Sequence, residues 1–230
     1  VGNSAMRCNT TGACNTAFGQ QALFCNSTAN HNTALGFQAM VCNTEGCQNV
    51  AVGRSMTKNC CGSNNSAVGY LALDCNVNGS NNTVVGSQAL NFNTSSNSTA
   101  VGYAAAYCST NCQNTAVGSL ALRGSGTSNG IGNTAVGYRA LCKNTSGGCN
   151  VAIGIDVLCS NTEGSWSAAV GYKALCSNTT GYSNVAVGNL TLCSNTTGNN
   201  NIGAGYYALG SKTCGSCNVA IGYQANRCNT

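Results

Sequence analysis

Proline is absent from this chain of 230 residues, and histidine occurs once, at His31. Charged residues make up 6% of the sequence, against about 25% in an ordinary soluble domain. The four carboxylates, Glu45, Asp74, Asp156 and Glu163, never recur as a pair that could divide acid and base roles. A cysteine nucleophile would need a base, and only one histidine is present. The sequence therefore predicts that the protein is not an enzyme and holds no metal or cofactor other than covalent glycans.

Positively charged residues are also few. The nine lysines and arginines, which give a net charge of +5, are spread along the chain without a cluster, and this argues against a nucleic-acid partner. No apolar run is long enough to span a membrane, and no secretory leader is recognisable. Because the chain begins without Met and inside a repeat, we expect it to be a section of a longer chain or a filament subunit.

What the sequence does contain is a tandem repeat, of which residues 133–142 are one copy. Successive copies are mostly 17 residues apart, with steps of 16 after Gly53, Gly86 and Gly102 and of 19 after Gly118. In such an architecture each copy contacts only its neighbours. The glycines that mark the fourteen copies are Gly2, Gly19, Gly36, Gly53, Gly69, Gly86, Gly102, Gly118, Gly137, Gly154, Gly171, Gly188, Gly205 and Gly222.

The residues before each marker glycine, numbered as position 0, alternate in size. Position −3 is mostly β-branched, position −2 is nearly always Ala, and position −1 is Val, Ile, Leu or Phe, as in residues 151–153. Alternation with period two is typical of a strand. We expect the large residues at −1 to line a narrow core, and the Ala/Gly face to be covered by a second copy or by the opposite layer of the same coil.

A second apolar pair, Ala at +3 and Leu at +4, follows the glycine, and Asn-Thr at +7 and +8 indicates a turn. Glycine and β-branched residues oppose a helix. We predict an all-β fold, a parallel β-solenoid or β-roll of about 14 rungs of 17 residues with two short strands each, continuous over residues 1–230. Stacked rungs would lie about 4.8 Å apart, with +4 Leu in the core.

Asparagine recurs at −4, where stacked side-chain amides can hydrogen-bond from rung to rung. We interpret this column as structural, and likewise the Tyr or Phe that is frequent at +1. The asparagines of the −4 column are Asn15, Asn32, Asn49, Asn65, Asn82, Asn114, Asn133, Asn150, Asn184, Asn201 and Asn218.

Two versions of the repeat carry a resemblance to known families. Residues 150–154 and 218–222, both Asn-Val-Ala-Ile-Gly, are similar to the repeat of trimeric autotransporter adhesin heads. The version Asn-Thr-Ala-Val-Gly-Tyr at residues 133–138 resembles tandem repeats of phage and algal-virus fibre proteins. The resemblance implies a left-handed parallel β-roll and an extracellular or virion-surface location.

Cysteine is abundant, with 18 residues, and this density predicts an oxidising compartment and disulfide bonds. Bridges between rungs, such as Cys159–Cys176, and bridges within a rung, such as Cys8–Cys14 or Cys142–Cys149, are both consistent with the spacing. The candidates are Cys8, Cys14, Cys25, Cys42, Cys47, Cys60, Cys61, Cys75, Cys108, Cys112, Cys142, Cys149, Cys159, Cys176, Cys193, Cys214, Cys217 and Cys228.

Eleven Asn-x-Ser/Thr sequons are present, and a sequon in a secreted protein indicates a surface site. Six share position +7 and would line one turn edge with sugars: Asn9, Asn26, Asn93, Asn144, Asn178 and Asn195. The others are Asn64, Asn78, Asn81, Asn97 and Asn189.

These patterns favour a structural role outside the cell. Solenoids normally need polar capping repeats, and an open strand edge invites pairing with another chain. We expect a secreted, glycosylated filament subunit that stacks head to tail and associates laterally through the Ala/Gly face. The alternatives are an adhesin or viral tail-fibre shaft that binds cell-surface glycans, and an ice-binding solenoid that uses the Thr column at +8.

Overall fold

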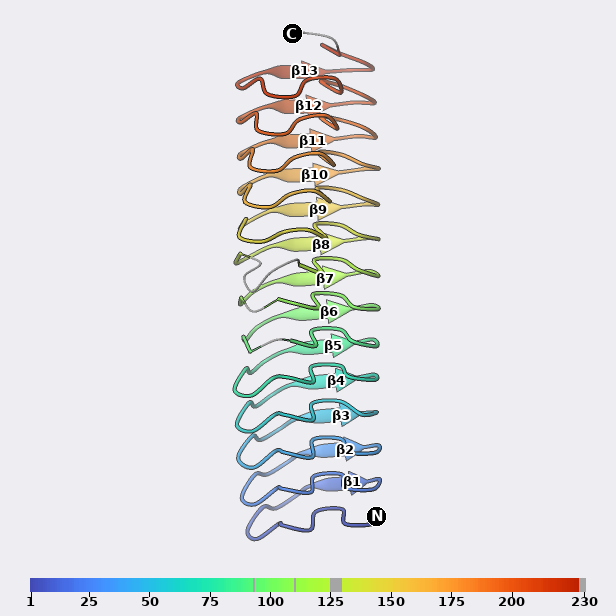
Figure 1. Ribbon diagram of the computed structural model, residues 1–230, viewed down its shortest axis with the longest axis vertical. Helices are drawn as coiled ribbons and strands as arrows, with labels where there is room; N and C mark the ends of the chain where they lie inside the picture. Colours follow the sequence, from blue (N-terminus) through green and yellow to red (C-terminus); the bar gives the residue numbers. More distant parts are fainter. Residues whose placement is uncertain (93, 110, 125–129, 228–230) are drawn as a thin grey trace. The chain divides into compact units, whose positions relative to one another are not determined.

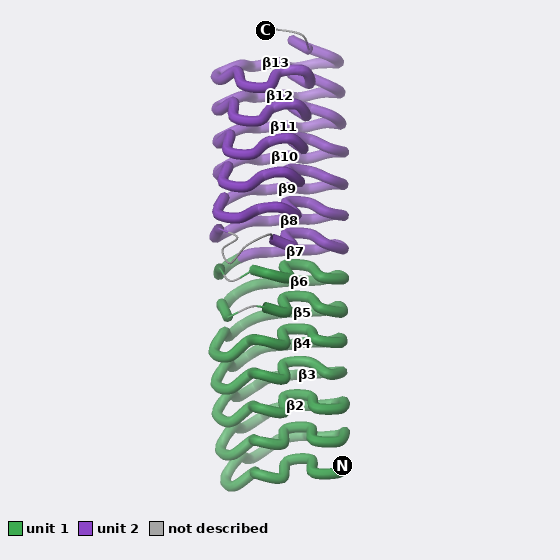
Figure 2. The backbone as a smooth tube through the Cα atoms, viewed as in Figure 1, with its two compact units in different colours: residues 1–113 green, residues 114–230 purple. Residues whose placement is uncertain are grey.

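The computed structural model describes residues 1–92, 94–109, 111–124 and 130–227, and within these ranges it contains thirteen strands and no helix. The chain divides into two compact units, unit 1 of residues Val1–Gln113 and unit 2 of residues Asn114–Thr230 (Figure 2). Unit 1 contains β1 (Thr16–Phe18), β2 (Thr33–Leu35), β3 (Val50–Val52), β4 (Ser66–Val68), β5 (Thr83–Val85) and β6 (Thr99–Val101). Unit 2 contains β7 (Thr115–Val117), β8 (Thr134–Val136), β9 (Val151–Ile153), β10 (Ala168–Val170), β11 (Val185–Val187), β12 (Ile202–Ala204) and β13 (Val219–Ile221).

Within each unit every strand pairs in parallel with the next one along the chain (Figure 1). The register places equivalent repeat positions opposite each other, for example Ala169 against Ala186. Every strand ends directly before a marker glycine, so the repeat in the sequence is the rung of the structure. The predicted all-β parallel solenoid with rungs of about 17 residues is confirmed.

The remainder of each rung is a series of turns, and the predicted second strand is wrong for the described residues. In the rung after β1, Gln21 at +2 and Leu23 at +4 have φ of 57° and 52°. Left-handed residues cannot continue an extended strand. Their geometry turns both Ala22 and Leu23 toward the interior, where both are fully buried. Neighbouring rungs still share backbone bonds here, as from Leu23 N to Ala39 O at 3.0 Å.

The strands turn the alanine at −2 toward the interior, whereas we predicted that the large residues at −1 would line it. In β11, Ala186 is fully buried, whereas Val185 and Val187 are 37% and 47% exposed. The interior at −2 is filled to the neighbouring wall in β12, where a Cβ added to Gly203 would lie 2.7 Å from Thr191 Cγ2. The alanine column therefore packs against the +3 and +4 residues, and the β-branched columns face outward. The Ala/Gly face is not available to a second copy.

The marker glycine allows rungs to approach closely where the chain leaves the strand. Gly188 has a φ of +129°, and a Cβ on it would lie 2.7 Å from the carbonyl oxygen of Gly205 in the next rung. A side chain is excluded on both conformational and steric grounds. The glycine thus sets the corner and the rung spacing together.

The −4 asparagines behave as predicted and bridge the rungs. The Oδ1 atom of Asn150 accepts the backbone N–H of Ser167 at 3.0 Å, and its Nδ2 donates to the carbonyl oxygen of Gly164 at 2.8 Å. The side chain is fully buried. Each amide therefore satisfies a corner of the backbone that the short strand leaves unpaired.

Candidate functional site

The +7 sequon row does not lie on the surface where we expected it. Asn9, at the beginning of the row, is half-buried, and Asn93 lies outside the described residues. The fully buried members are Asn26, Asn144, Asn178 and Asn195.

The hydrogen bonds of Asn178 explain why this row is unsuited to carry sugar. Its Nδ2 donates to Oδ1 of Asn161 in the preceding rung and to the carbonyl oxygen of Gly181, both at 2.8 Å. Its Oδ1 accepts from Nδ2 of Asn195 at 2.9 Å. Both hydrogens of the amide nitrogen are used, so a glycan bond at this atom would remove one of them and force the rung open. The prediction of a glycosylated +7 edge is therefore wrong for the buried members.

Asparagine at +7 forms a second structural amide ladder that sequence reasoning missed. Asn161 has no Ser or Thr two residues later, yet it makes the same bonds as Asn178, to Asn144 Oδ1 at 2.8 Å and to Gly164 O at 2.9 Å. The signal was available, because asparagine persists at +7 where the sequon is absent. Further members without a sequon are Asn43, Asn59 and Asn76.

Five sequons lie on the surface. Three of them occupy position −5 in successive rungs of unit 1, and Nδ2 of Asn81 donates to Oδ1 of Asn97 at 3.3 Å. These asparagines have positive φ, 60° at Asn81 and 61° at Asn97, which places them at a corner. The exposed sequon asparagines are Asn64, Asn78, Asn81, Asn97 and Asn189.

Thiols form a column in unit 2, at position +5 of four successive rungs. The Sγ of Cys142 donates to the carbonyl oxygen of Cys159 at 3.4 Å, and the same contact joins Cys159 to Cys176 at 3.6 Å and Cys176 to Cys193 at 3.4 Å. The described cysteines are thiols in this structure, so the predicted disulfide bonds stay a prediction, and Cys228 lies outside the described residues.

Cys142 and Cys159, the first two thiols of this column, have pKa values shifted in opposite directions. When Cys142 turns its S–H from the Cys159 carbonyl to the Cys159 sulfur, this hydrogen bond lowers the pKa of Cys159 from 9.0 to about 6; burial and the charge of Asp156 oppose the shift, and the hydroxyl of Ser160 and the charge of Arg139 support it. The pKa of Cys142 is raised, first by the same hydrogen bond and then by burial. The pKa of Cys176, farther along the column, is raised mainly by burial. Cys159 is therefore the member of the column that most readily forms a thiolate.

Another close pair of thiols lies in unit 1, where Sγ of Cys60 and Sγ of Cys61 are 3.1 Å apart. The hydrogen bond that Cys61 donates to Cys60 raises the pKa of Cys61 to about 11. The expected within-rung pairs Cys8–Cys14 and Cys142–Cys149 and the expected between-rung bridge Cys159–Cys176 stay predictions, since the described cysteines are thiols.

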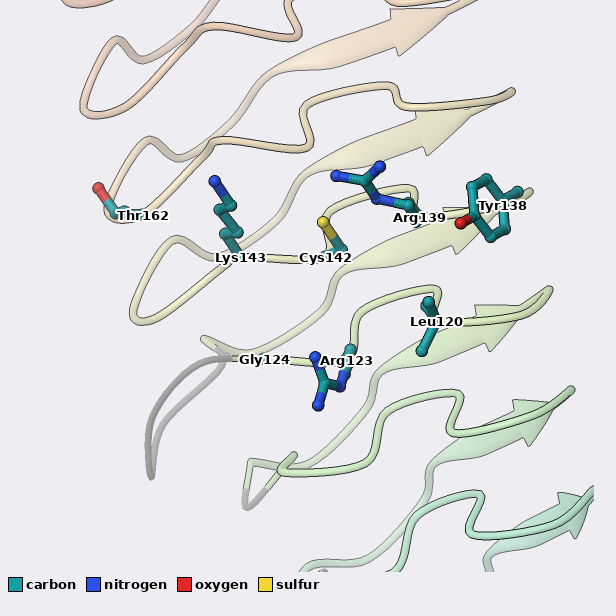
Figure 3. A pocket seen from close by; sticks show the side chains of 8 residues that line it. All are labelled: Leu120, Arg123, Gly124, Tyr138, Arg139, Cys142, Lys143 and Thr162. Atoms are coloured by element: carbon teal, nitrogen blue, oxygen red, sulfur yellow. The ribbon is translucent and has the colours of Figure 1, made fainter.

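A basic groove of about 590 Å³ lies beside the column in unit 2 (Figure 3). Arg123 lies one rung below Cys142, while Arg139 and Lys143 flank it from the rung of β8 (Figure 3). Arg139 Nε also contacts Oδ1 of Asp156 at 3.4 Å. Three cations around an open depression suit an anionic group. In the described ranges no three side chains of the His, Cys, Asp or Glu types are placed to hold a metal ion.

Comparison with known proteins finds no matching family model, no matching curated protein and no matching solved structure. No helix among the described residues is long and apolar enough to cross a membrane. Inference about function therefore starts from the rung itself.

Proposed function

We propose that the protein is a structural, non-catalytic subunit of an extracellular filament that grows by stacking rungs of one chain on rungs of another. One observation carries this proposal: within each unit, neighbouring described rungs are joined by one repeated set of bonds. Thr33 N–H donates to Asn49 O at 2.8 Å near the beginning of the chain, and Ile202 N–H donates to Asn218 O at 2.8 Å near its end. A rung edge is therefore a template for any other rung.

The test is to purify residues 1–230 and to examine them by electron microscopy and fibre diffraction. We expect filaments with a meridional spacing of about 4.8 Å, since the rungs stack along the fibre. A monodisperse 23.1 kDa particle at micromolar concentration, measured by light scattering, would contradict the proposal.

Glycosylation belongs to the same proposal, but at the exposed corner column. Peptide mapping of protein from a secretory host should find glycans at Asn64, Asn81 or Asn97 and none at Asn178. Ser66→Ala, which removes the Asn64 sequon, should lower the intact mass by one glycan, whereas Thr180→Ala should leave the mass at Asn178 unchanged apart from the substitution. A glycan on Asn178 in folded protein would sink this assignment.

A second candidate function is an adhesin or tail-fibre shaft, as the resemblance to adhesin heads and fibre repeats implies. The basic groove favours it, because Arg123, Arg139 and Lys143 could hold the carboxylate or sulfate of an acidic glycan. An array of sialylated and sulfated glycans tests this. Arg123→Gln with Lys143→Gln should abolish binding, and Lys58→Gln in unit 1 should preserve it.

The ice-binding alternative loses its original basis. The +8 threonine hydroxyls that we expected to order water donate instead to the next rung, as from Thr145 Oγ1 to Thr162 O at 2.8 Å and from Thr179 Oγ1 to Thr196 O at 3.0 Å. The outward hydroxyls of unit 1 at −3, including Thr33 and Thr83, are the remaining basis for this alternative. Measuring thermal hysteresis of the purified chain decides it.

A further inference from the structure

The outer surface of the strands in unit 2 is an apolar face made of side chains that usually form cores. We define the strand face as positions −3, −1 and +1 of the rungs of β7 to β13. From β9 onward both strand positions are apolar in every rung, and Val151 and Ile202 at −3 are 37% and 42% exposed. No charged residue occurs on the strand face. Its polar members are Thr115, Ser119 and Thr134 in β7 and β8 and Asn189 after β11, so the apolar part is the strand positions of β9 to β13. An uncharged patch of this kind marks an interaction site.

Unit 1 supplies an internal comparison. Its −3 positions are mostly hydroxyl residues, with Thr in β1, β2, β5 and β6 and Ser in β4. The apolar character is therefore not a requirement of the rung, because the same fold accepts Thr at this position. It is a local property of β9 to β13.

In two rungs of the strand face, β10 and β12, a small side chain lies beside a large one, whereas β9, β11 and β13 have large side chains at both positions. In β10 the small residue is Ala168 at −3 and the large one is Val170 at −1; in β12 the order is reversed, with Ile202 at −3 and Ala204 at −1. No rung has alanine at both positions. A two-fold axis along the direction of stacking would place −1 of one copy opposite −3 of the other, so each alanine would meet a larger residue.

We propose that the strand face of unit 2 packs against the strand face of a second copy of this chain, with both copies running in the same direction and rung facing rung. In this arrangement Ala204 lies opposite Ile202 of the second copy, and Val170 lies opposite Ala168. Copies that run in opposite directions would place −1 opposite −1 and −3 opposite −3, which sets Ala168 of β10 against Ala168 and Val170 against Val170 and loses this match. Two sheets paired in this way lie about 10 Å apart.

The extent of the strand face meets what a stable pair needs. Seven rungs at ~4.8 Å and five residues at ~3.3 Å give a planar outline of ~550 Å², of which the five rungs of β9 to β13 supply ~400 Å². Two copies would cover ~1,100 Å², close to the ~1,000 Å² expected of a specific interface. A second copy also has the same rung spacing, so its columns stay in register over the full length.

The experiment counts chains per rung, by sedimentation equilibrium for dispersed protein or by mass per length for filaments, so it does not depend on axial growth. Wild type should contain two chains. Val187→Glu and Val185→Lys should each reduce this to one, because an unpaired charge would be buried. The double variant V185K/V187E should restore two, because the introduced lysine of each copy then faces the introduced glutamate of the other. Thr180→Glu, at an exposed turn outside the strand face, is the control and should keep two chains.

One chain per rung in the wild type would overturn the proposal. A double variant that stays single while circular dichroism shows it folded would overturn the same-direction arrangement. Two chains per rung in Val187→Glu would show that the pair forms elsewhere.

Discussion

The asparagines of this protein occupy positions where the side chain forms hydrogen bonds with equivalent residues of the neighbouring rungs. An asparagine in either amide ladder donates and accepts in the direction of stacking, and no other side chain of that size does both. In the rung after Asn195, position +7 holds Lys212 instead of asparagine. Oδ1 of Asn195 consequently has no hydrogen-bond partner among the described residues. One interruption thus leaves an unsatisfied atom in the rung below.

Asn178→Asp tests the ladder. A carboxylate cannot donate to Asn161 Oδ1 or to Gly181 O, and it would place a charge against both oxygens in a buried site. We expect a loss of about 3 kcal/mol or more in the free energy of unfolding, measured by chemical denaturation. Asn64→Asp, at an exposed corner, is the matched control and should change stability by less than about 0.5 kcal/mol. Equal effects of the two variants would contradict the ladder.

Cys159 provides a residue-scale prediction that depends on pH. Its pKa of about 6 means that alkylation by iodoacetamide, followed by peptide mass spectrometry, should have its midpoint near pH 6, whereas the raised pKa of Cys176 should place its midpoint at higher pH. Cys142→Ala removes the hydrogen-bond donor and should move the Cys159 midpoint upward. Identical pH profiles for Cys159 and Cys176 in the wild type would refute this.

The same shift has a consequence for stability, with a definite sign. The pKa of Cys159 is lower in the folded chain than in the unfolded chain, so the thiolate stabilises the fold above pH 9 and this contribution disappears as the pH falls through 6. The free energy of unfolding should rise between pH 6 and pH 9. Cys159→Ser should flatten that rise, and an unchanged slope in this variant would assign it to another group.

At the scale of the element, the strand and the turn opposite it share a fixed volume. In most rungs the residue at −2 and the residue that faces it at +3 of the preceding rung are both alanine, as at the equivalent positions 186 and 174. In β12 these two positions hold Gly203 and Thr191. The missing methyl group of the glycine accommodates the extra atoms of the threonine. The pair therefore acts as one unit of packing.

Gly203→Ala should destabilise the chain by about 1–3 kcal/mol, because its Cβ would clash with Thr191 Cγ2. Thr191→Ala should itself cost stability, since the threonine Oγ1 donates to Gly205 O at 2.6 Å. The double variant restores the common Ala–Ala pair and should be more stable than Gly203→Ala alone, as measured by thermal unfolding. Strict additivity of the two changes would show that the residues do not pack together.

At the scale of the whole molecule, the fold is held by ladders that do not need covalent stitches. Within each unit, backbone and side-chain amide bonds join neighbouring described rungs while the described cysteines are thiols. Far-UV circular dichroism should therefore show a β-rich folded chain in reductant. Oxidation should raise the unfolding midpoint, because each bridge across a 17-residue loop adds about 3 kcal/mol in the chain-entropy model. A random-coil spectrum in reductant would show that disulfides are required for folding.

The repeat itself determined the parallel solenoid, the rung length, the place of the strand before the marker glycine and the structural −4 asparagines. Each of these follows from spacing and residue type, because a side chain recurring every 17 residues must stack in any in-register coil. The burial of +4 Leu was also predictable, as the only large apolar position in its half of the rung.

Only the tertiary structure decided which face of the strand is interior. Alternation of Ala with Val fits either orientation, and the rule that large apolar residues are buried pointed to the wrong one. Leu175 from the turn and Ala186 from the strand are both fully buried, whereas Val185 and Val187 on either side of the alanine face outward. The +7 asparagines turn inward for a related reason. The sign of φ alternates along the backbone before them, and the residue pattern does not reveal this. The side chain of Asn178 therefore points to the ladder and not to solvent.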